Sequence, residues 1–221
     1  MSSDTRLQEA VLAELGWDPS VTAANIGVTA KAGVVTLSGR VETFAEKKAA
    51  GKAAQRVKGV KAVAEEILVE VPFERTRTDE DIAAAAIERL AWDTSVPADA
   101  VSVRVEQGWI TLTGEVTWYY QKEAAAQDIA RLHGIVGVSN QVIVRPVVDV
   151  PVVDVADIGS KISRALDRSS MFYDQSIVVT ADGGNIHLTG KVRSSHDRQV
   201  AWETAWSAPG ATSVENDIAI L

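Results

Sequence analysis

Hydrophobic positions recur three times along the chain with one spacing. The stretches GVVTLSG, GWITLTG and GNIHLTG begin at residues 33, 108 and 184, so they are offset by 75 (108 minus 33) and 76 (184 minus 108) residues. Extending this register outward aligns three units, 4–71, 79–146 and 154–221. Units of about 70 residues are longer than most solenoid repeats, so the pattern predicts three small domains, each with its own core.

Each unit contains two kinds of periodicity. An i, i+4, i+8 apolar spacing, as at Leu7, Val11 and Leu15, predicts a first helix. Two alternating runs follow, as at Ile26 and Val28, and their period of two predicts strands. An alanine-rich stretch then predicts a second helix, and a last alternating run predicts a third strand. The expected fold class is α+β, with two helices on one face of a three-stranded mixed sheet whose strand order stays open.

Nine glycines recur in register and divide each unit. Three are predicted to lie in the hairpin turn, three inside the central strand and three after the second helix. A glycine inside a strand indicates a close approach of another backbone or helix, or a bulge. In that order the glycines are Gly33, Gly108 and Gly184; Gly39, Gly114 and Gly190; and Gly59, Gly134 and Gly210.

These motifs together resemble the BON domain (bacterial OsmY and nodulation). Each unit shows a glycine, a Val/Ile-x-Leu-Ser/Thr-Gly strand or a close variant of it, an alanine-rich helix and a further glycine, and the second and third units have asparagine in the last strand. The resemblance covers nearly the whole chain as three tandem copies. It implies the αββαβ fold and a non-enzymatic role in osmotic or envelope stress, often at phospholipid surfaces. One cytoplasmic branch of the family is linked to potassium binding.

Composition narrows the possible partners and location. The chain has 221 residues and no cysteine, which excludes disulfides, thiolate zinc sites and cysteine nucleophiles. A net charge of −8 argues against non-specific binding of nucleic acid or strongly anionic membranes, although local basic patches stay possible. No transmembrane segment or export signal is evident, so a soluble cytoplasmic protein is expected.

No catalytic or metal-binding motif is evident. His133, His187 and His196 stand where the other units have different residues, and no set of serine, histidine and acid recurs. The sequence therefore predicts no enzyme activity, no cofactor and no side-chain metal site.

Aromatic residues gather in the second unit. Trp109, Trp118, Tyr119 and Tyr120 lie around the predicted hairpin and helix start, beside Lys122, and form a candidate surface for a lipid headgroup or a protein partner.

Other tryptophans suggest packing. Trp17 and Trp92 follow the first helices of two units and are expected to cover their cores. Trp202 and Trp206 lie one helical turn apart in the third unit only, which predicts an interdomain or oligomer contact.

Two further features distinguish the units. Asn140 and Asn216 match at a predicted inward position where the first unit has Glu65, so that unit is expected to differ locally. The linkers also differ, because 72–78 is short and polar whereas 146–155 repeats PVVDV and is expected to be stiff or to add an edge strand.

The leading expectation is a non-catalytic triple BON protein that binds a phospholipid surface or protein partner during osmotic or general stress. The alternative is a cytoplasmic potassium-responsive binding protein of the same family.

Overall fold

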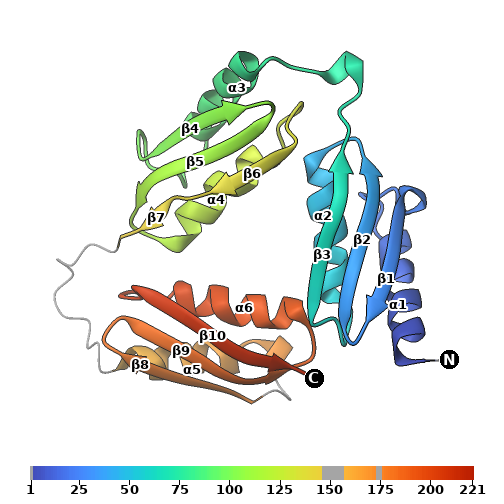
Figure 1. Cartoon of the computed structure of the whole chain (residues 1–221). Coiled ribbons are helices and arrows are strands. Elements are labelled where there is room, and N and C mark those ends of the chain that lie inside the picture. Colours follow the sequence, from blue (N-terminus) through green and yellow to red (C-terminus); the bar gives the residue numbers. More distant parts are fainter. Residues whose placement is uncertain (1, 146–156, 173–175) are drawn as a thin grey trace.

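The computed structural model describes residues 2–145, 157–172 and 176–221, and it contains three α-β-β-α-β units in sequence (Figure 1). The first unit consists of α1 (Ser3–Trp17), β1 (Ile26–Lys31), β2 (Val34–Val41), α2 (Phe44–Arg56) and β3 (Ala62–Val69). The second consists of α3 (Asp79–Trp92), β4 (Val101–Glu106), β5 (Trp109–Val116), α4 (Tyr119–Ile129), β6 (Gly137–Asn140) and β7 (Ile143–Val144). The third consists of α5 (Ile158–Asp167), β8 (Ile177–Asp182), β9 (Asn185–Val192), α6 (Ser195–Trp206) and β10 (Ser213–Ile220). The predicted α+β fold class is confirmed. The repeated PVVDV segment lies outside the described residues.

The second strand is central in every sheet. The strand orders are β1-β2-β3, β4-β5-β6 with β7 also on β5, and β10-β9-β8. In each unit the first strand pairs antiparallel and the last strand pairs parallel with the central one. A parallel neighbour needs a crossover connection, which the second helix supplies. This settles the strand order that the hydrophobic pattern left open.

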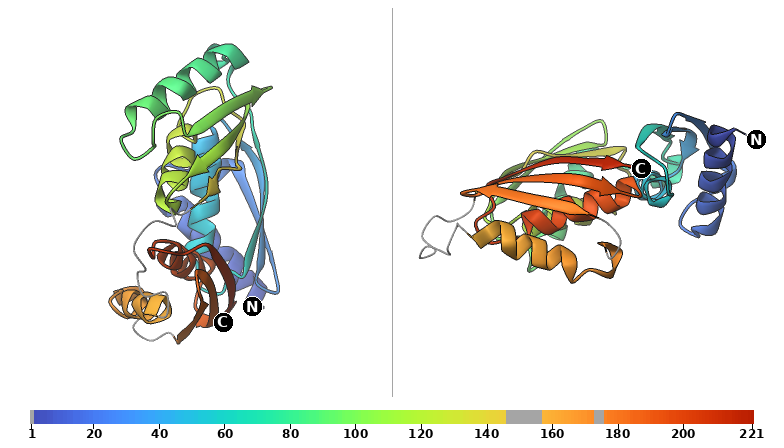
Figure 2. Two further views of the ribbon diagram at one scale, coloured as in Figure 1. Left: turned by 90° about the vertical axis from the view of Figure 1, so that its left-hand side faces the viewer. Right: turned by 90° about the horizontal axis from the view of Figure 1, so that it is seen from below.

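Both helices of a unit cover one face of its sheet. Val11 and Leu15 of α1 and Leu37 of β2 are fully buried, and equivalent residues fill the second and third cores. Figure 2 shows the helices and sheet of the third unit as separate layers. The predicted inward positions therefore form three separate cores.

The glycine inside each central strand allows a close backbone approach, one of the alternatives that the sequence left open. Gly39, Gly114 and Gly190 have φ values of 133°, 132° and 130°. A Cβ atom at any of them would lie 2.1 Å from the carbonyl oxygen of the residue that precedes the first strand. No side chain fits there, so the recurrence of this glycine is a steric requirement of the fold.

The hairpin turns also use backbone that favours glycine. Gly33 and Gly108 have φ values of 87° and 74°, as expected, but in the third unit Gly183 takes the positive φ of 59°. Gly184 is restricted for another reason, because a Cβ there would lie 2.4 Å from the carbonyl oxygen of Gly210.

The asparagines of the last strands fasten these strands to the second helices. Asn140 Nδ2 donates to the Lys122 carbonyl at 2.8 Å, and Asn216 Nδ2 donates to the Arg198 carbonyl at 3.1 Å. The first unit uses a different link, in which Lys47 Nζ donates to the carbonyl of Ile67 at 2.8 Å. The predicted local difference at Glu65 is thus present, because a carboxylate cannot donate the bond that an amide makes.

The second helices of the three units face one another across the middle of the molecule (Figure 1). Phe44, the first residue of α2, packs with the core of the second unit. Helices α2 and α6 are in contact, and the backbone N–H of Gly59 donates to the carbonyl of Arg193 at 3.1 Å. The first unit thus touches both of the others.

Candidate functional site

The aromatic residues of the second unit do not form one exposed surface. Tyr120 is 58% exposed and Trp109 is 48% exposed, whereas Trp118 and Lys122 are half-buried. Tyr119 is buried, contrary to the expectation of an exposed ring. The candidate surface is therefore reduced, and its two most exposed members lie on different elements, β5 and α4.

Tyr119 is buried because it packs against the third unit. Its ring centroid lies 5.1 Å from that of Trp202, edge to face, and 5.7 Å from that of Trp206, nearly stacked. Burial raises the pKa of the Tyr119 phenol, and the nearby carboxylate of Glu123 adds to the effect. We call Tyr119, Trp202 and Trp206 the aromatic joint.

Trp109 lies on the sheet face that the helices leave uncovered. It pairs with Gly137 across β5 and β6, and its ring crosses the place that a side chain at residue 137 would occupy. The small residue opposite allows the ring to lie flat on the sheet, and about half of its surface stays in contact with solvent.

Trp17 and Trp92 are the most exposed tryptophans, which contradicts the expectation that they cover the cores. They occupy equivalent last positions of α1 and α3 and are 84% and 79% exposed. Trp17 follows the buried Leu15 by two residues, and two steps of about 100° each turn its side chain to the far side of the helix. Helical periodicity extended to the end of the element would have shown this.

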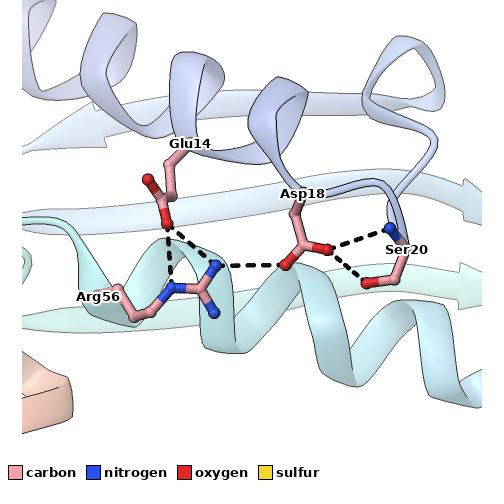
Figure 3. A network of polar contacts seen from close by, with 4 residues as sticks. All are labelled: Glu14, Asp18, Ser20 and Arg56. Atoms are coloured by element: carbon pink, nitrogen blue, oxygen red, sulfur yellow. Dashed lines mark hydrogen bonds and ion pairs between the residues drawn. The ribbon is translucent and has the colours of Figure 1, made fainter.

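In the first and second units, a polar network joins the end of the first helix to the second helix. In the first unit Arg56 donates from Nε to Glu14 at 3.0 Å and from Nη2 to Asp18 at 3.2 Å (Figure 3). The Ser20 N–H and hydroxyl donate to Asp18 at 3.1 and 2.6 Å. These serine bonds, more than Arg56, hold the pKa of Asp18 below its usual value.

In the second unit the cation of this network lies on the first helix and the carboxylate on the second. Its cation is Arg89 on α3, which donates from Nε to Asp128 Oδ1 at 3.2 Å. In the described part of the chain, no donor is placed to make a hydrogen bond to the other oxygen of Asp128, which is buried. Burial, reinforced by the neighbouring Asp93, raises the pKa of Asp128 despite the attraction of Arg89.

No arrangement typical of catalysis is found among these groups. His187 contacts Asp217 at 2.8 Å on the exposed face of its sheet. Within the described ranges, no three histidine or acidic side chains are grouped so that they could hold a metal ion. None of the helices in the described part of the chain has the length and apolar character needed to cross a membrane.

Comparison with known proteins identifies the repeated unit. The family model described as "BON domain" matches residues 3–70, 78–146 and 154–221. No curated protein matches the chain.

Two solved structures of CdsD, a structural protein of the type III secretion system of Chlamydia trachomatis, are similar to the chain. The C-terminal domain is 15% identical, with all of both chains covered and a TM-score of 0.27. The other structure is 16% identical over 98% of this chain and 92% of that one, with a TM-score of 0.25.

Proposed function

The chain belongs to the BON domain family, and on that premise we propose that it is a non-enzymatic binding protein that attaches to phospholipid surfaces through exposed tryptophans. BON domains bind phospholipids or proteins, and the family is non-catalytic. The observation that carries the proposal is the exposure of Trp17 and Trp92, at 84% and 79%.

Two large rings in solvent at equivalent positions have no role in the cores. Exposed indole costs hydration free energy, whereas at a membrane interface its apolar ring and its N–H group are both satisfied. Transfer of one ring out of water is worth about 2 kcal/mol. Two such rings on one chain therefore supply a weak, reversible attachment, to which Tyr120 and Trp109 can add.

The charge of the chain indicates what kind of surface fits. A net charge of −8 repels a strongly anionic membrane, so apolar contact rather than general electrostatic attraction must supply most of the affinity. We therefore expect binding to vesicles of neutral phosphatidylcholine that survives high salt. A role in osmotic stress and a cytoplasmic location are part of this proposal.

Flotation with phosphatidylcholine vesicles tests the proposal. The double variant Trp17→Ser, Trp92→Ser should stay at the bottom of the gradient, whereas the intact chain should float with the vesicles. A chain that does not float with neutral or anionic vesicles would exclude the lipid-binding function.

A potassium-responsive role is the second candidate. One observation favours it, since the carboxylate of Asp128 is close to that of Asp93, and a monovalent cation would neutralise this pair. An ion bound only by the folded chain raises its stability, but general screening does so as well. Melting curves in matched potassium, sodium and choline chloride separate the two effects, and superimposed potassium and sodium curves would exclude this role.

A further inference from the structure

The first unit has a shallow hollow where α1 begins. It lies between the first turn of α1, the hairpin turn and the loop that joins α2 to β3. Leu7 and Gly59 contribute to its lining, and Arg6, Lys58 and Lys61 bring three cations to it. We call this place the basic hollow.

The three cations of the basic hollow form no ion pair with any carboxylate that the structure describes. Among the described residues, ion pairs are made by Arg40, Arg56 and Arg89 but not by Arg6, Lys58 or Lys61. Asp4 also lines the hollow, but its Oδ1 accepts a hydrogen bond from the backbone N–H of Ala32 at 3.1 Å. The hollow therefore carries an excess of positive charge in a chain whose net charge is −8.

The fold does not require these cations. The equivalent hollow of the second unit is lined by Asp81 in place of Arg6 and His133 in place of Lys58, with Arg77 as its one lysine or arginine. Val136 occupies the position of Lys61 in the sequence. The third unit has Asp157, Pro209 and Thr212 at the three positions. Since all three units fold alike, the group of three cations is specific to the first, whereas Arg77 in the second hollow stands beside Asp81.

The surroundings fix the backbone that carries two of these cations. The loop that carries Lys58 is fixed by the bond from the Gly59 N–H to the carbonyl of Arg193 in the third unit. The side chain of Lys61 lies over the turn at Gly33, so close that a Cβ there would come within 2.8 Å of it. The N-terminal end of α1 lies at the same end of the unit, and the positive end of its helix dipole adds to the attraction for an anion.

We propose that the basic hollow binds a phosphate-bearing anion, with Arg6, Lys58 and Lys61 as its cationic contacts. Several cations around a concave place favour a ligand with more than one negative charge, either a free phosphate compound or a phosphate headgroup at a membrane. The site lies in the opening turn of α1, whereas Trp17 is at the other end of that helix, so the two binding functions can be tested separately.

Calorimetric titration with pyrophosphate, at an ionic strength held constant with chloride, measures binding of the free anion. The intact chain should show saturable binding, and Lys58→Ala with Lys61→Ala should weaken it at least about tenfold. Arg6→Gln should act in the same direction. The matched control is His133→Ala, in the equivalent hollow of the second unit, which should bind like the intact chain. Melting curves check that each variant is folded.

A second measurement distinguishes the source of the phosphate. Flotation compares phosphatidylcholine vesicles with and without phosphatidylglycerol, at one salt concentration. If the lysine variants lose only the added binding that phosphatidylglycerol gives, the ligand is a headgroup. If pyrophosphate binds and this difference is absent, the ligand is a free phosphate compound.

The proposal is overturned if folded lysine variants match the intact chain in both measurements, or if neither measurement detects binding. The variant Trp17→Ser, Trp92→Ser should retain pyrophosphate binding. Anion binding in the basic hollow can therefore be confirmed or rejected even if the tryptophans do not attach the chain to membranes.

Discussion

At the scale of single residues, equivalent positions carry different charges although the backbone around them is the same. Asp18 in the first unit and Asp93 in the second both follow the first helix and accept hydrogen bonds from a serine two residues later. The partner on the second helix differs, because Arg56 reaches Asp18 whereas Asp128 lies beside Asp93. Asp18 is therefore attracted by the cation of Arg56, whereas Asp93 and Asp128 repel each other. This contrast predicts that neutralising Asp18 and neutralising Asp128 have opposite effects on stability.

Replacing Asp128 by Asn should stabilise the chain at neutral pH. The folded-state pKa of Asp128 is raised, mainly by burial, so ionisation costs free energy of folding once the pH exceeds the ordinary value of 3.8. The variant removes that cost while keeping an oxygen for Arg89. Its melting temperature should exceed that of the intact chain at pH 7, and the difference should disappear in acid.

Asp18→Asn is the matched control for this prediction. The pKa of Asp18 is lowered, chiefly by Ser20, so its ionised form stabilises the folded state, and this stabilisation is lost as the pH falls. Its melting temperature should be below that of the intact chain at pH 7. Two variants that shift in the same direction would contradict the assigned arrangement of charges.

At the scale of elements, the start of α4 connects two units rather than facing solvent. Tyr119 and Tyr120 are adjacent, but one contacts Trp202 and Trp206 while the other is 58% exposed. Edge-to-face and stacked ring pairs contribute about 1 kcal/mol each beyond burial. The aromatic joint therefore helps to hold the second and third units together.

Removal of the Tyr119 ring should loosen this joint without unfolding either unit. In Tyr119→Ala, small-angle scattering should give a larger radius of gyration, and limited proteolysis should cut faster between the second and third units. Tyr120→Ala is the matched control, and both measurements should match the intact chain. An unchanged radius in Tyr119→Ala would show that other contacts fix the two units.

Much of each element could be predicted from the sequence, because local periodicity determines which residues are buried. For this reason the pattern correctly predicts the burial of Leu15 and the position of the glycines inside the central strands. Strand order was not accessible, since it depends on pairing between distant segments. The burial of Tyr119 comes from contacts with another unit, so the pattern of its own unit does not predict it. The exposure of Trp17 is predictable, because it follows from the helical period when the last residue of the helix is included.

At the scale of the whole molecule, three small cores are linked by contacts of different kinds. The joint between the second and third units is aromatic, whereas the first and third are joined by helix contact and the bond from Gly59 to Arg193. Phe44 and Val69 of the first unit pack against the core of the second. The units are thus distinct in fold but share part of their buried surface.

A fragment of residues 79–146 should fold alone, but with marginal stability. A core of this size supplies only a few kcal/mol, and the fragment lacks Phe44 and Val69. Circular dichroism should show helix and strand with a low melting temperature, and a fragment of residues 1–146 should melt higher. An unfolded 79–146 fragment would contradict the proposal of independent domains.

The central claim is that Trp17 and Trp92 attach this three-unit chain to phospholipid surfaces, and flotation with phosphatidylcholine vesicles tests it most directly. The intact chain should float at low and high salt, and Trp17→Ser with Trp92→Ser should reduce the floating fraction at least about tenfold, because about 2 kcal/mol is lost per ring. The control variant Glu74→Ser changes an exposed polar side chain in the linker after β3 and should float like the intact chain. Equal flotation of the intact chain and the double tryptophan variant, with both proteins folded, would contradict the account.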